Sequence, residues 1–478
     1  MKKSLRRIKA SLMAMTAVAS FAAAPLANAG VTFELPSLTA FAADGDVLVY
    51  ESYLYKVTDD GIVITAYSGT ETELVIPSAI DETPVTSIGG SAFKKNTAIT
   101  AVTIPETVTS IGKSAFNGCS KLEKLTLNEG LTTLGEGAFC DTKISSIYIP
   151  STIKNVTSYG GPFRNCESLN NITFGKGITT IPAYLFANCT GLTEITIPDT
   201  VTLIDGDAFV GCTNLKEIEI PSNVTTIGAS AFADCTSLEK LTLNEGLTTL
   251  GEGAFCDTKI SSVYIPSTIK NVTSYGGPFR NCESLNNVTF GEGITTIPDY
   301  LFDECKELKE ITIPDTVKTI GSNAFSHCIS LTSIDIPYYV KTIDNSAFND
   351  CTSLKNITIH NPDCNIYDKS NTIPEKTVIK GYFSSTAKHY AITYERDFLS
   401  IGTYTIGDVN EDGMIDSSDA SMILAEYALI QIGSESSLTE AQRIAADVNR
   451  DYSVDSTDAS KILAYYAKVS TGQDATLE

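Results

Sequence analysis

A phenylalanine recurs every 23 residues through the middle of this 478-residue chain, with an interval of 24 at two places. The recurring positions are Phe93, Phe116, Phe139, Phe163, Phe186, Phe209, Phe232, Phe255, Phe279, Phe302, Phe325 and Phe348. A fixed period of this length is typical of a solenoid, because one repeat forms a coil that cannot bury its own apolar face and must stack on its neighbours. The sequence therefore predicts twelve coils around one apolar core, in place of separate globular domains.

Each period places apolar and polar residues in the same order. The unit reads Cys-x-x-Leu-x-x-Ile-x-Ile-Pro-x-x-Val-x-x-Ile-Gly-x-x-Ala-Phe, and Cys189–Phe209 follows it closely. The alternation Ile195-Thr196-Ile197 has the period of a half-buried strand, which Pro198 then ends. We expect a second short extended piece over Val201–Ile204 and a helical turn over Ala208–Cys212.

The Ile-Pro pair and the Ala-Phe-x-x-Cys signature resemble the BspA-like class of leucine-rich repeats of bacterial surface proteins, over residues 85–361. The resemblance implies a leucine-rich-repeat solenoid of short strands and short helical turns. The strand-rich residues 47–84 are expected to form an N-terminal cap, and residues 362–401 a C-terminal cap. Both caps are needed because the ends of a solenoid expose apolar surface.

The first 29 residues have the composition of a secretory signal peptide. They contain five basic residues and no acidic one, an apolar stretch over Ala10–Leu26, and the small residues of Ala27–Ala29 as a cleavage point. Ala40–Ala42 offers a second cleavage point, near residue 43. No other stretch has the ~18 consecutive apolar residues that a membrane span needs. We therefore expect a secreted protein.

Twelve cysteines in an exported chain would ordinarily indicate disulfides. Nine of them, however, occupy one slot, three residues after a Phe: Cys119, Cys166, Cys189, Cys212, Cys235, Cys282, Cys305, Cys328 and Cys351. Such a column is typical of a packing position, where Cys acts as a small apolar residue. Neighbouring coils would bring these residues to ~5 Å, which a disulfide can span. Because parallel side chains make bridging awkward, we expect free thiols.

A longer duplication lies inside the array of repeats. Leu122–Pro182 and Leu238–Pro298 differ at three of 61 positions, at an offset of 116 residues, or five coils. A catalytic site needs unlike residues that converge once, whereas a recognition surface can be lengthened by copying. The duplication therefore favours binding or spacing over catalysis.

Side chains between the two buried aliphatic residues of each strand are expected to point outward. They form a ladder of Thr103, Thr126, Tyr148, Thr173, Thr196, Glu219, Thr242, Tyr264, Thr289, Thr312, Asp335 and Thr358. Threonine is common at exposed strand positions without any binding role. Tyr148 and Tyr264 occupy corresponding places in the duplicated blocks, and their amphipathic rings suit contact with a ligand. We predict a ligand-binding surface around these two tyrosines.

Two acidic loops follow the array, in a segment from residue 403 to residue 478 with 14 acidic and four basic residues. Each loop has oxygen donors at positions 1, 3, 5, 9 and 12 and a backbone carbonyl at position 7. The first set is Asp408, Asn410, Asp412, Met414, Asp416 and Asp419, and the second is Asp447, Asn449, Asp451, Ser453, Asp455 and Asp458. Because a 12-residue loop with this alternation wraps one Ca²⁺, the sequence predicts two calcium ions.

Each loop leads into a helix of nearly the same sequence, Ala420–Ala428 and Ala459–Ala467. Between them, Ser437–Glu440 is predicted to be a capping box that begins a third helix toward Ala446. The paired loop and helix units resemble a type I dockerin, over residues 403–478. The resemblance implies a cellulosome component that attaches to the cohesin modules of a scaffoldin.

The same resemblance implies that loop positions 10 and 11 contact the cohesin, and here these are Ser417, Ser418, Ser456 and Thr457. Position 12 is Asp, where ordinary EF-hands have Glu. Position 6 of the second loop is Tyr452, where Gly is usual. Because this position turns with a positive φ that Tyr resists, we expect the second loop to bind calcium more weakly.

Composition and motifs disfavour several other functions. With 34 basic and 57 acidic residues the net charge is -23, so nucleic acid and anionic membranes are poor partners. The chain has no Trp to stack on sugars, and His327, His360 and His389 stand alone without a metal or nucleophile spacing. It carries no phosphate loop, no Gly-x-Ser-x-Gly and no His-Glu-x-x-His motif. No pair of acids is indicated for glycoside hydrolysis.

The sequence therefore predicts a secreted, non-catalytic cellulosome subunit. Its repeats bind a protein or glycan, and its dockerin attaches to a scaffoldin cohesin in the presence of calcium. Two alternatives stay open. One is a polysaccharide- or protein-degrading enzyme with its site in the array, and the other is a passive spacer whose array binds nothing.

Overall fold

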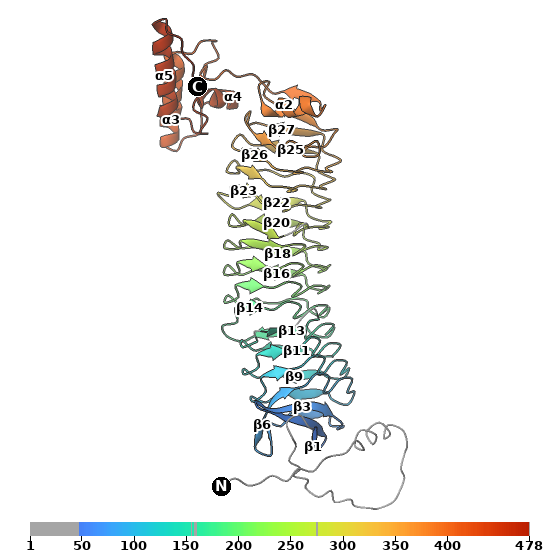
Figure 1. Ribbon diagram of the computed structural model, residues 1–478. Coiled ribbons are helices and arrows are strands. Elements are labelled where there is room, and N and C mark those ends of the chain that lie inside the picture. Colours follow the sequence, from blue (N-terminus) through green and yellow to red (C-terminus); the bar gives the residue numbers. More distant parts are fainter. Residues whose placement is uncertain (1–46, 154, 157–159, 274–275, 478) are drawn as a thin grey trace, which may run out of the picture. The chain divides into compact units, whose positions relative to one another are not determined.

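The computed structural model describes residues 47–153, 155–156, 160–273 and 276–477. The signal peptide expected over residues 1–29 lies outside these ranges. The chain forms two compact units, Met1–Leu238 and Glu239–Glu478, which are described in turn (Figure 1). None of the helices in the described ranges has the length and apolarity that crossing a bilayer requires.

The first unit is made of short strands joined by turns. Its strands are β1 (Leu48–Tyr50), β2 (Tyr53–Thr58), β3 (Gly61–Tyr67), β4 (Glu73–Val75), β5 (Ala79–Ile80), β6 (Thr83–Ile88), β7 (Ala101–Thr103), β8 (Ser110–Ile111), β9 (Lys124–Thr126), β10 (Thr133–Leu134), β11 (Ser146–Ile149), β12 (Asn155–Val156), β13 (Asn171–Phe174), β14 (Thr180–Ile181), β15 (Leu203–Ile204), β16 (Glu217–Glu219) and β17 (Thr226–Ile227).

Two ladders organise the first part of this unit, and a further parallel ladder, β14–β15–β17, follows them. One begins with the antiparallel pairs β1–β2 and β2–β3 and continues in parallel through β6, β8, β10 and β12. The other runs β4–β7–β9–β11–β13. Over residues 83–174 each coil adds one strand to each ladder, so that Ile111 pairs with Ile88 before it and Leu134 after it. This one-strand step is the structural form of the 23-residue period.

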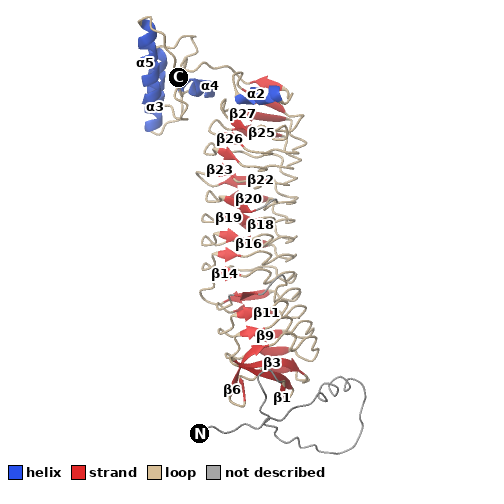
Figure 2. Cartoon of the chain, viewed as in Figure 1, coloured by secondary structure: helices blue, strands red, loops and turns tan. Residues whose placement is uncertain are grey.

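The second unit continues with strands of the same kind and adds helices, which lie at its carboxyl end (Figure 2). Its elements are β18 (Lys240–Thr242), β19 (Thr249–Gly251), β20 (Ser262–Ile265), β21 (Asn271–Thr273), β22 (Asn287–Phe290), β23 (Thr296–Ile297), β24 (Thr319–Ile320), β25 (Ser333–Ile336), β26 (Thr342–Ile343), β27 (Asn356–Ile359), β28 (Asn365–Ile366), β29 (Val378–Gly381), α2 (Thr386–Thr393), β30 (Phe398–Ser400), α3 (Ser417–Gln431), α4 (Glu440–Ala446) and α5 (Ser456–Ser470).

Parallel ladders again organise the repeats of this unit. They are β20–β22, β19–β21, β23–β24–β26–β28 and β25–β27–β29–β30. After β30 the strands stop, and α3 packs along α5 around a small core of its own. That core includes Val409, Ile423, Leu438, Val448 and Ile462.

The recurring phenylalanines form the centre of the core, and all twelve are fully buried. Successive rings stack within each unit: the centroids of Phe93 and Phe116 are 4.5 Å apart at 5°, and those of Phe325 and Phe348 are 5.5 Å apart at 2°. The predicted leucine-rich-repeat solenoid is therefore confirmed, and it has about 14 turns where twelve were predicted. Truncation of a fully buried Phe to Ala typically lowers the free energy of unfolding by ~3–5 kcal/mol, so each ring contributes substantially to stability.

The nine cysteines of the column are buried next to these rings, and all twelve cysteines of the chain are free thiols. Each thiol of the column donates a hydrogen bond to the carbonyl of the Phe in the preceding coil, at 3.0–3.6 Å. Each of these bonds therefore joins a thiol to the backbone of the preceding coil. A packing role for this column follows.

The strand predicted over Ile195–Ile197 does not pair with a neighbour. Its burial still alternates, with Thr196 exposed and Ile197 buried. The preceding coil carries Phe174, where Cys189–Phe209 has Ile197, and its ring meets Phe186 edge-on at 6.3 Å. The same interruption follows Phe290 in the duplicated block. A large ring in the small aliphatic slot thus precedes these two breaks in the ladder.

The helical turn predicted over Ala208–Cys212 is a tight turn and does not reach an α-helix. Val210 N–H donates to Asp207 C=O, and Cys212 N–H to Phe209 C=O, both at 3.2 Å and three residues back. Asp207 begins the turn with φ of 55°. A coil this short has room for the tighter bonding pattern only.

Candidate functional site

The first acidic loop is closed by hydrogen bonds from its own backbone to its side chains. Asp408 accepts from the N–H groups of Asp412 and Gly413 at 3.1 and 3.0 Å. Asp419 is fully buried and accepts from Val409 N–H at 2.8 Å and Asp416 N–H at 2.9 Å. The first and last positions of the loop thereby hold their carboxylates against the loop backbone.

The second loop repeats this geometry. Asp447 accepts from the N–H groups of Asp451 and Tyr452 at 3.0 and 2.9 Å. Asp458 accepts from Asn449 N–H at 3.1 Å and Asp455 N–H at 3.0 Å. Two loops 39 residues apart therefore fold alike, as their matching donor positions predict.

The intermediate positions also agree between the loops. The amide oxygen of Asn410 accepts from Asp412 N–H, and that of Asn449 from Asp451 N–H, each at 2.9 Å. Position 5 in turn accepts from position 7, at 2.9 Å for Asp412 and Met414 and at 2.8 Å for Asp451 and Ser453. The side-chain oxygens at positions 3 and 5 are thus held by backbone N–H groups of their own loop.

Position 6 has a left-handed backbone in both loops, with φ of 85° at Gly413 and 71° at Tyr452. The expected conformational conflict at Tyr452 is therefore present. Within the described ranges, no three His, Cys, Asp or Glu side chains form a preassembled metal cage. Each loop offers a mixed set of oxygens, with four carboxylates, one amide and one backbone carbonyl, which suits the hard Ca²⁺ ion.

Charge states in the loops follow from these contacts. Hydrogen bonds from Ser418 hold the pKa of Asp416 below its ordinary value, and hydrogen bonds from Thr457 do the same for the pKa of Asp455. Burial raises the pKa of Asp447 to about 6, against the hydrogen bonds of Tyr452 and Tyr338. Position 9 is thus readily ionised, whereas position 1 of the second loop is a buried acid.

Helices α3 and α5 begin directly after position 9. Asp416 and Asp455 are their N-caps, and each forms a reciprocal box with the Asp at position 12. Loop positions 10 and 11 therefore open each helix, and Ser417, Ser418, Ser456 and Thr457 are all exposed. The four residues predicted to contact a cohesin lie on accessible surface in two equivalent settings.

The capping box predicted at Ser437 and Glu440 is wrong. Thr439 is the N-cap of α4 and its partner is Gln442, whose side chain accepts from Thr439 N–H at 3.0 Å. Ser437 donates instead to the carboxylate of Glu426, with its N–H at 2.9 Å and its hydroxyl at 2.8 Å. Glu426 lies on α3, so a tertiary partner takes the serine that sequence spacing had assigned to the cap.

Tyr148 and Tyr264 are exposed by 40 % and 37 %, and both lie on the outward side of their strands. The hydroxyl of Tyr264 donates to Glu245 at 2.6 Å, and that of Tyr148 donates to Glu129. Around Tyr148 a shallow hollow is lined by Thr126 and Thr173 of the ladder. Each ring is therefore fixed at its tip by a carboxylate and is partly exposed.

Family models and solved structures place this chain among known proteins. The model of the BspA type leucine rich repeat region matches residues 86–160, 159–276 and 277–408, in six copies. The chain belongs to this family. The model of the dockerin type I domain matches residues 406–465, so the carboxyl-terminal part of this BspA-type protein is a dockerin of a calcium-binding type. No curated protein matches the chain.

Three solved structures illustrate the likeness. A leucine-rich repeat protein of Bacteroides ovatus is 26 % identical, with a TM-score of 0.56, over 74 % of this chain and 99 % of that chain. The pneumococcal vaccine antigen PcpA is 19 % identical, with a TM-score of 0.49, over 75 % of this chain and 99 % of that chain. A leucine rich cell surface protein of Faecalibacterium prausnitzii is 24 % identical, with a TM-score of 0.36, over 75 % and 95 %.

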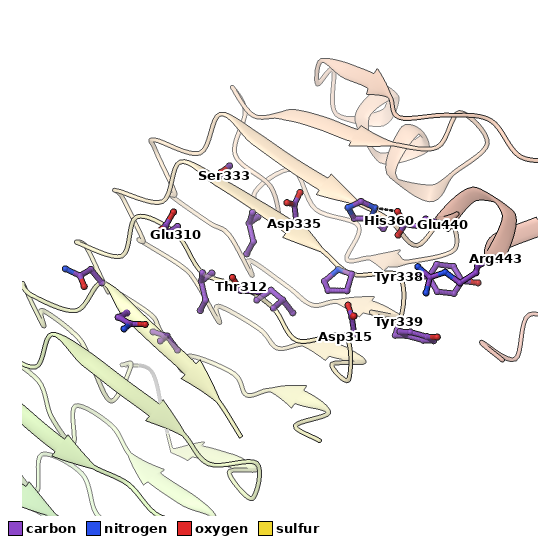
Figure 3. A pocket seen from close by; sticks show the side chains of 17 residues that line it. Glu310, Thr312, Asp315, Ser333, Asp335, Tyr338, Tyr339, His360, Glu440 and Arg443 are labelled. Carbon is purple, nitrogen blue, oxygen red and sulfur yellow. Dashed lines mark hydrogen bonds and ion pairs between the residues drawn. The ribbon is translucent and has the colours of Figure 1, made fainter. Parts of the chain in front are cut away.

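One site was missed by the sequence reading because its residues are far apart in the chain. A groove of about 610 Å³ is lined by Asp335, Tyr338 and His360 of the repeats and by Glu440 and Arg443 of the dockerin (Figure 3). The prediction that His360 stands alone is wrong, since its Nδ1 lies 2.6 Å from Glu440 Oε2. A separation of 80 residues leaves no local signal for this pair.

Proposed function

We propose that this protein is a secreted, non-catalytic cellulosome subunit whose dockerin attaches it to a cohesin module of a scaffoldin. The observation that carries the proposal is the matched pair of loops, each followed by a helix that opens with exposed small hydroxyl residues. A dockerin match over residues 406–465 supports it. In this assignment the repeats before residue 403 are the cargo, with residues 47–84 and 362–401 as their caps.

Each loop would hold one calcium ion. The oxygens would come from the side chains at positions 1, 3, 5, 9 and 12 and from the backbone carbonyl of Met414 or Ser453. The two ions would thus be bound by the twelve residues predicted above. A bound ion supplies positive charge that neutralises clustered carboxylates. The residues of the chain orient those carboxylates through backbone N–H groups and set the start of α3 and α5, which carry the cohesin-facing positions.

The repeat array would bind a protein or glycan on the outward side of its strands. Tyr148 and Tyr264 are the best supported contacts, because each presents a ring whose hydroxyl is anchored by a carboxylate one coil earlier. Preorganised aromatic rings lose little conformational entropy when they meet a partner. Binding of the full chain to cell-wall polysaccharides and surface proteins, compared with Tyr148→Ala and Tyr264→Ala together, tests this assignment.

Capture of the full chain by immobilised type I cohesins tests the docking function. We expect retention in calcium and release in a chelator. Asp412→Ala with Asp451→Ala should abolish retention, while Tyr148→Ala with Tyr264→Ala should leave it unchanged. Retention that persists in chelator, or in the loop variant, would overturn the proposal.

A further inference from the structure

The second calcium loop of the dockerin lies against the last repeats, within the second unit. Its first position, Asp447, is only 3 % exposed, and the phenol of Tyr338 donates to its Oδ2 at 3.1 Å. Tyr338 follows β25, on the outward side of the strand ladder, where it also lines the groove beside His360 and Glu440 (Figure 3). A predicted calcium ligand is thus held by a residue of the array.

Position 6 of the loop makes the next contact. The ring of Tyr452 lies 5.9 Å from that of Tyr338, and the Nζ of Lys341 lies 3.8 Å from the centre of the Tyr452 ring. A cation over an aromatic face is stabilising, more so where water is excluded. This packing offers a reason for a Tyr where the left-handed backbone favours Gly.

Arg450, at position 4 of the second loop, makes a further contact between the dockerin and the rest of the second unit. Arg450 Nη1 lies 3.2 Å from Asp363 Oδ1, and the pair is partly exposed. The pair of His360 and Glu440 adds a second polar link, between β27's end and α4. The array therefore meets the dockerin through an aromatic centre with charged pairs beside it.

The two loops differ at positions 4, 6, 7, 8 and 11, and the differences at positions 4 and 6 lie where the second loop touches the last repeats. Their side-chain donors at positions 1, 3, 5, 9 and 12 are the same residue types, and so is the Ser at position 10. Position 4 is Glu411 in the first loop and Arg450 in the second, and position 6 is Gly413 in the first and Tyr452 in the second. Of these two residues, Tyr452 contacts Lys341 of the repeats and Arg450 contacts Asp363 of the C-terminal cap.

We propose that the last repeats form a docking surface for the dockerin's second loop, and that Tyr338 is a positioning residue for calcium ligand Asp447. This rests on the proposed function, since it requires an ion in that loop. A hydrogen bond from outside a metal site fixes the orientation of a ligand and raises metal affinity, with loss of about 10–100-fold on its removal. By linkage, calcium in the second loop strengthens the contact with the array by the same factor.

Calorimetric titration of the full chain with calcium tests the proposal. Asp451→Ala identifies the binding step of the second loop. Tyr338→Phe keeps the ring and removes the donor, so we expect about a tenfold weaker second-loop step and an unchanged first-loop step. Lys341→Met should weaken the same step by a smaller factor.

The chain provides matched controls in the array. Lys318 lies one repeat before Lys341 and covers Tyr339 at 4.2 Å, and it makes this contact within the array. Lys318→Met and Tyr339→Phe should therefore leave both calcium steps unchanged. They remove the same chemical groups at neighbouring positions, which separates a specific effect on the second loop from a general loss of array stability.

The outcomes distinguish the two proposals. Suppose that Asp451→Ala binds one ion fewer, and that Tyr338→Phe and Tyr339→Phe bind calcium in the second loop with equal affinity. This result would overturn the docking surface and leave the calcium assignment standing. An unchanged number of ions in Asp451→Ala would overturn the calcium assignment and the positioning role with it. A tenfold loss confined to Tyr338→Phe supports both.

Discussion

The cysteine column shows how one residue position serves the stack. Sequence reasoning predicted a packing role from the phase of the nine residues, yet the spacing of ~5 Å between coils left disulfides open. The structure adds the direction of each thiol, which donates to the Phe carbonyl of the preceding coil, as Cys212 does to Phe186 at 3.3 Å. The hydrogen-bond acceptor is a backbone carbonyl 26 residues earlier in the chain. The regular spacing of the cysteines alone does not identify this acceptor.

Burial also sets the reactivity of these thiols. It raises the pKa of Cys212 to about 12 and that of Cys119 to about 11, and the thiolate is the reactive form. We therefore expect the nine column cysteines to resist iodoacetamide in the folded protein at pH 8 and to react after unfolding. Mass spectrometry of protein purified without oxygen should find twelve labelled thiols after unfolding, and fewer would show disulfides.

His360 carries a pH dependence of its own. Its hydrogen bond with Glu440 is the main cause that raises the pKa of His360 above 6.5, against desolvation, with Asp335 and Asp315 also facing it. A raised folded-state pKa means that the stabilisation is fully present below pH 6.5 and is lost as the pH rises through the folded-state pKa. We expect the pair to contribute about 1 kcal/mol at pH 6.

Thermal or denaturant unfolding of the full chain between pH 6 and pH 9 measures this contribution. His360→Asn should remove that part of the pH dependence and leave the pH 9 value nearly unchanged. His389 provides the control, because it lies on α2 and is not paired with Glu440. An equal pH profile in wild type and His360→Asn would contradict the prediction.

At the scale of elements, the 23-residue period predicted the fold of the repeats better than short local motifs, such as the capping box, predicted individual helix ends. The alternation of apolar and polar residues correctly gave the buried and exposed sides of the ladder, as Thr196 and Ile197 show. It did not reveal that Phe174 coincides with a break in strand pairing, since that depends on ring packing between coils. The matching geometry of the two loops was predictable because all their oxygen-bearing residues lie within 12 residues of one another, whereas the groove around His360 was not. The role of these residues as calcium ligands stays a prediction.

The cap of α4 is a second case in which tertiary contacts decide. Thr439→Ala should destabilise the dockerin by about 1 kcal/mol, because the N-cap hydroxyl accepts from Gln442 N–H. Thr439→Ser, which keeps the hydroxyl, should cost much less. Circular dichroism of the helices in calcium, followed through a urea titration, measures the difference. Equal stability of the Ala and Ser variants would contradict the cap assignment.

At the scale of the whole molecule, the two kinds of module depend on different forces. The repeats are held by apolar stacking, with twelve buried rings, and the dockerin has a core of eight buried residues. Clustered carboxylates in each loop repel one another until an ion neutralises them, so ion binding and folding are coupled there. Chelation should therefore melt residues 407–468 and leave the repeats folded.

One experiment tests whether calcium removal unfolds the dockerin and leaves the repeats folded. Far-ultraviolet circular dichroism of the full chain should lose the helical signal of α3 and α5 in chelator and keep its strand signal, and calcium should restore the helices. Magnesium at the same concentration is the control, because Mg²⁺ demands a smaller, octahedral site. An unchanged helical signal in chelator would contradict coupled folding.

Near-identity of the two loop and helix units bears on how the dockerin meets its partner. Ser417 and Ser418 in one unit match Ser456 and Thr457 in the other, and all four are exposed. The contact between the second loop and the array involves loop positions 1, 4 and 6, so positions 10 and 11 stay accessible in both units. Rotation of the dockerin by about half a turn would present nearly the same surface to a cohesin.

We therefore predict two binding orientations. Ser417→Arg with Ser418→Arg should lower cohesin affinity by about twofold, the statistical factor for the loss of one of two equivalent orientations, and Ser456→Arg with Thr457→Arg should do the same. The quadruple variant should lose binding, because a bulky charge on either face would clash and leave partner groups unpaired. Titration calorimetry in calcium measures all three, with Thr196→Arg in the array as a control for added charge. If one double variant alone abolishes binding, a single orientation is used, and the likeness of the two units is then a trace of duplication without a role in docking.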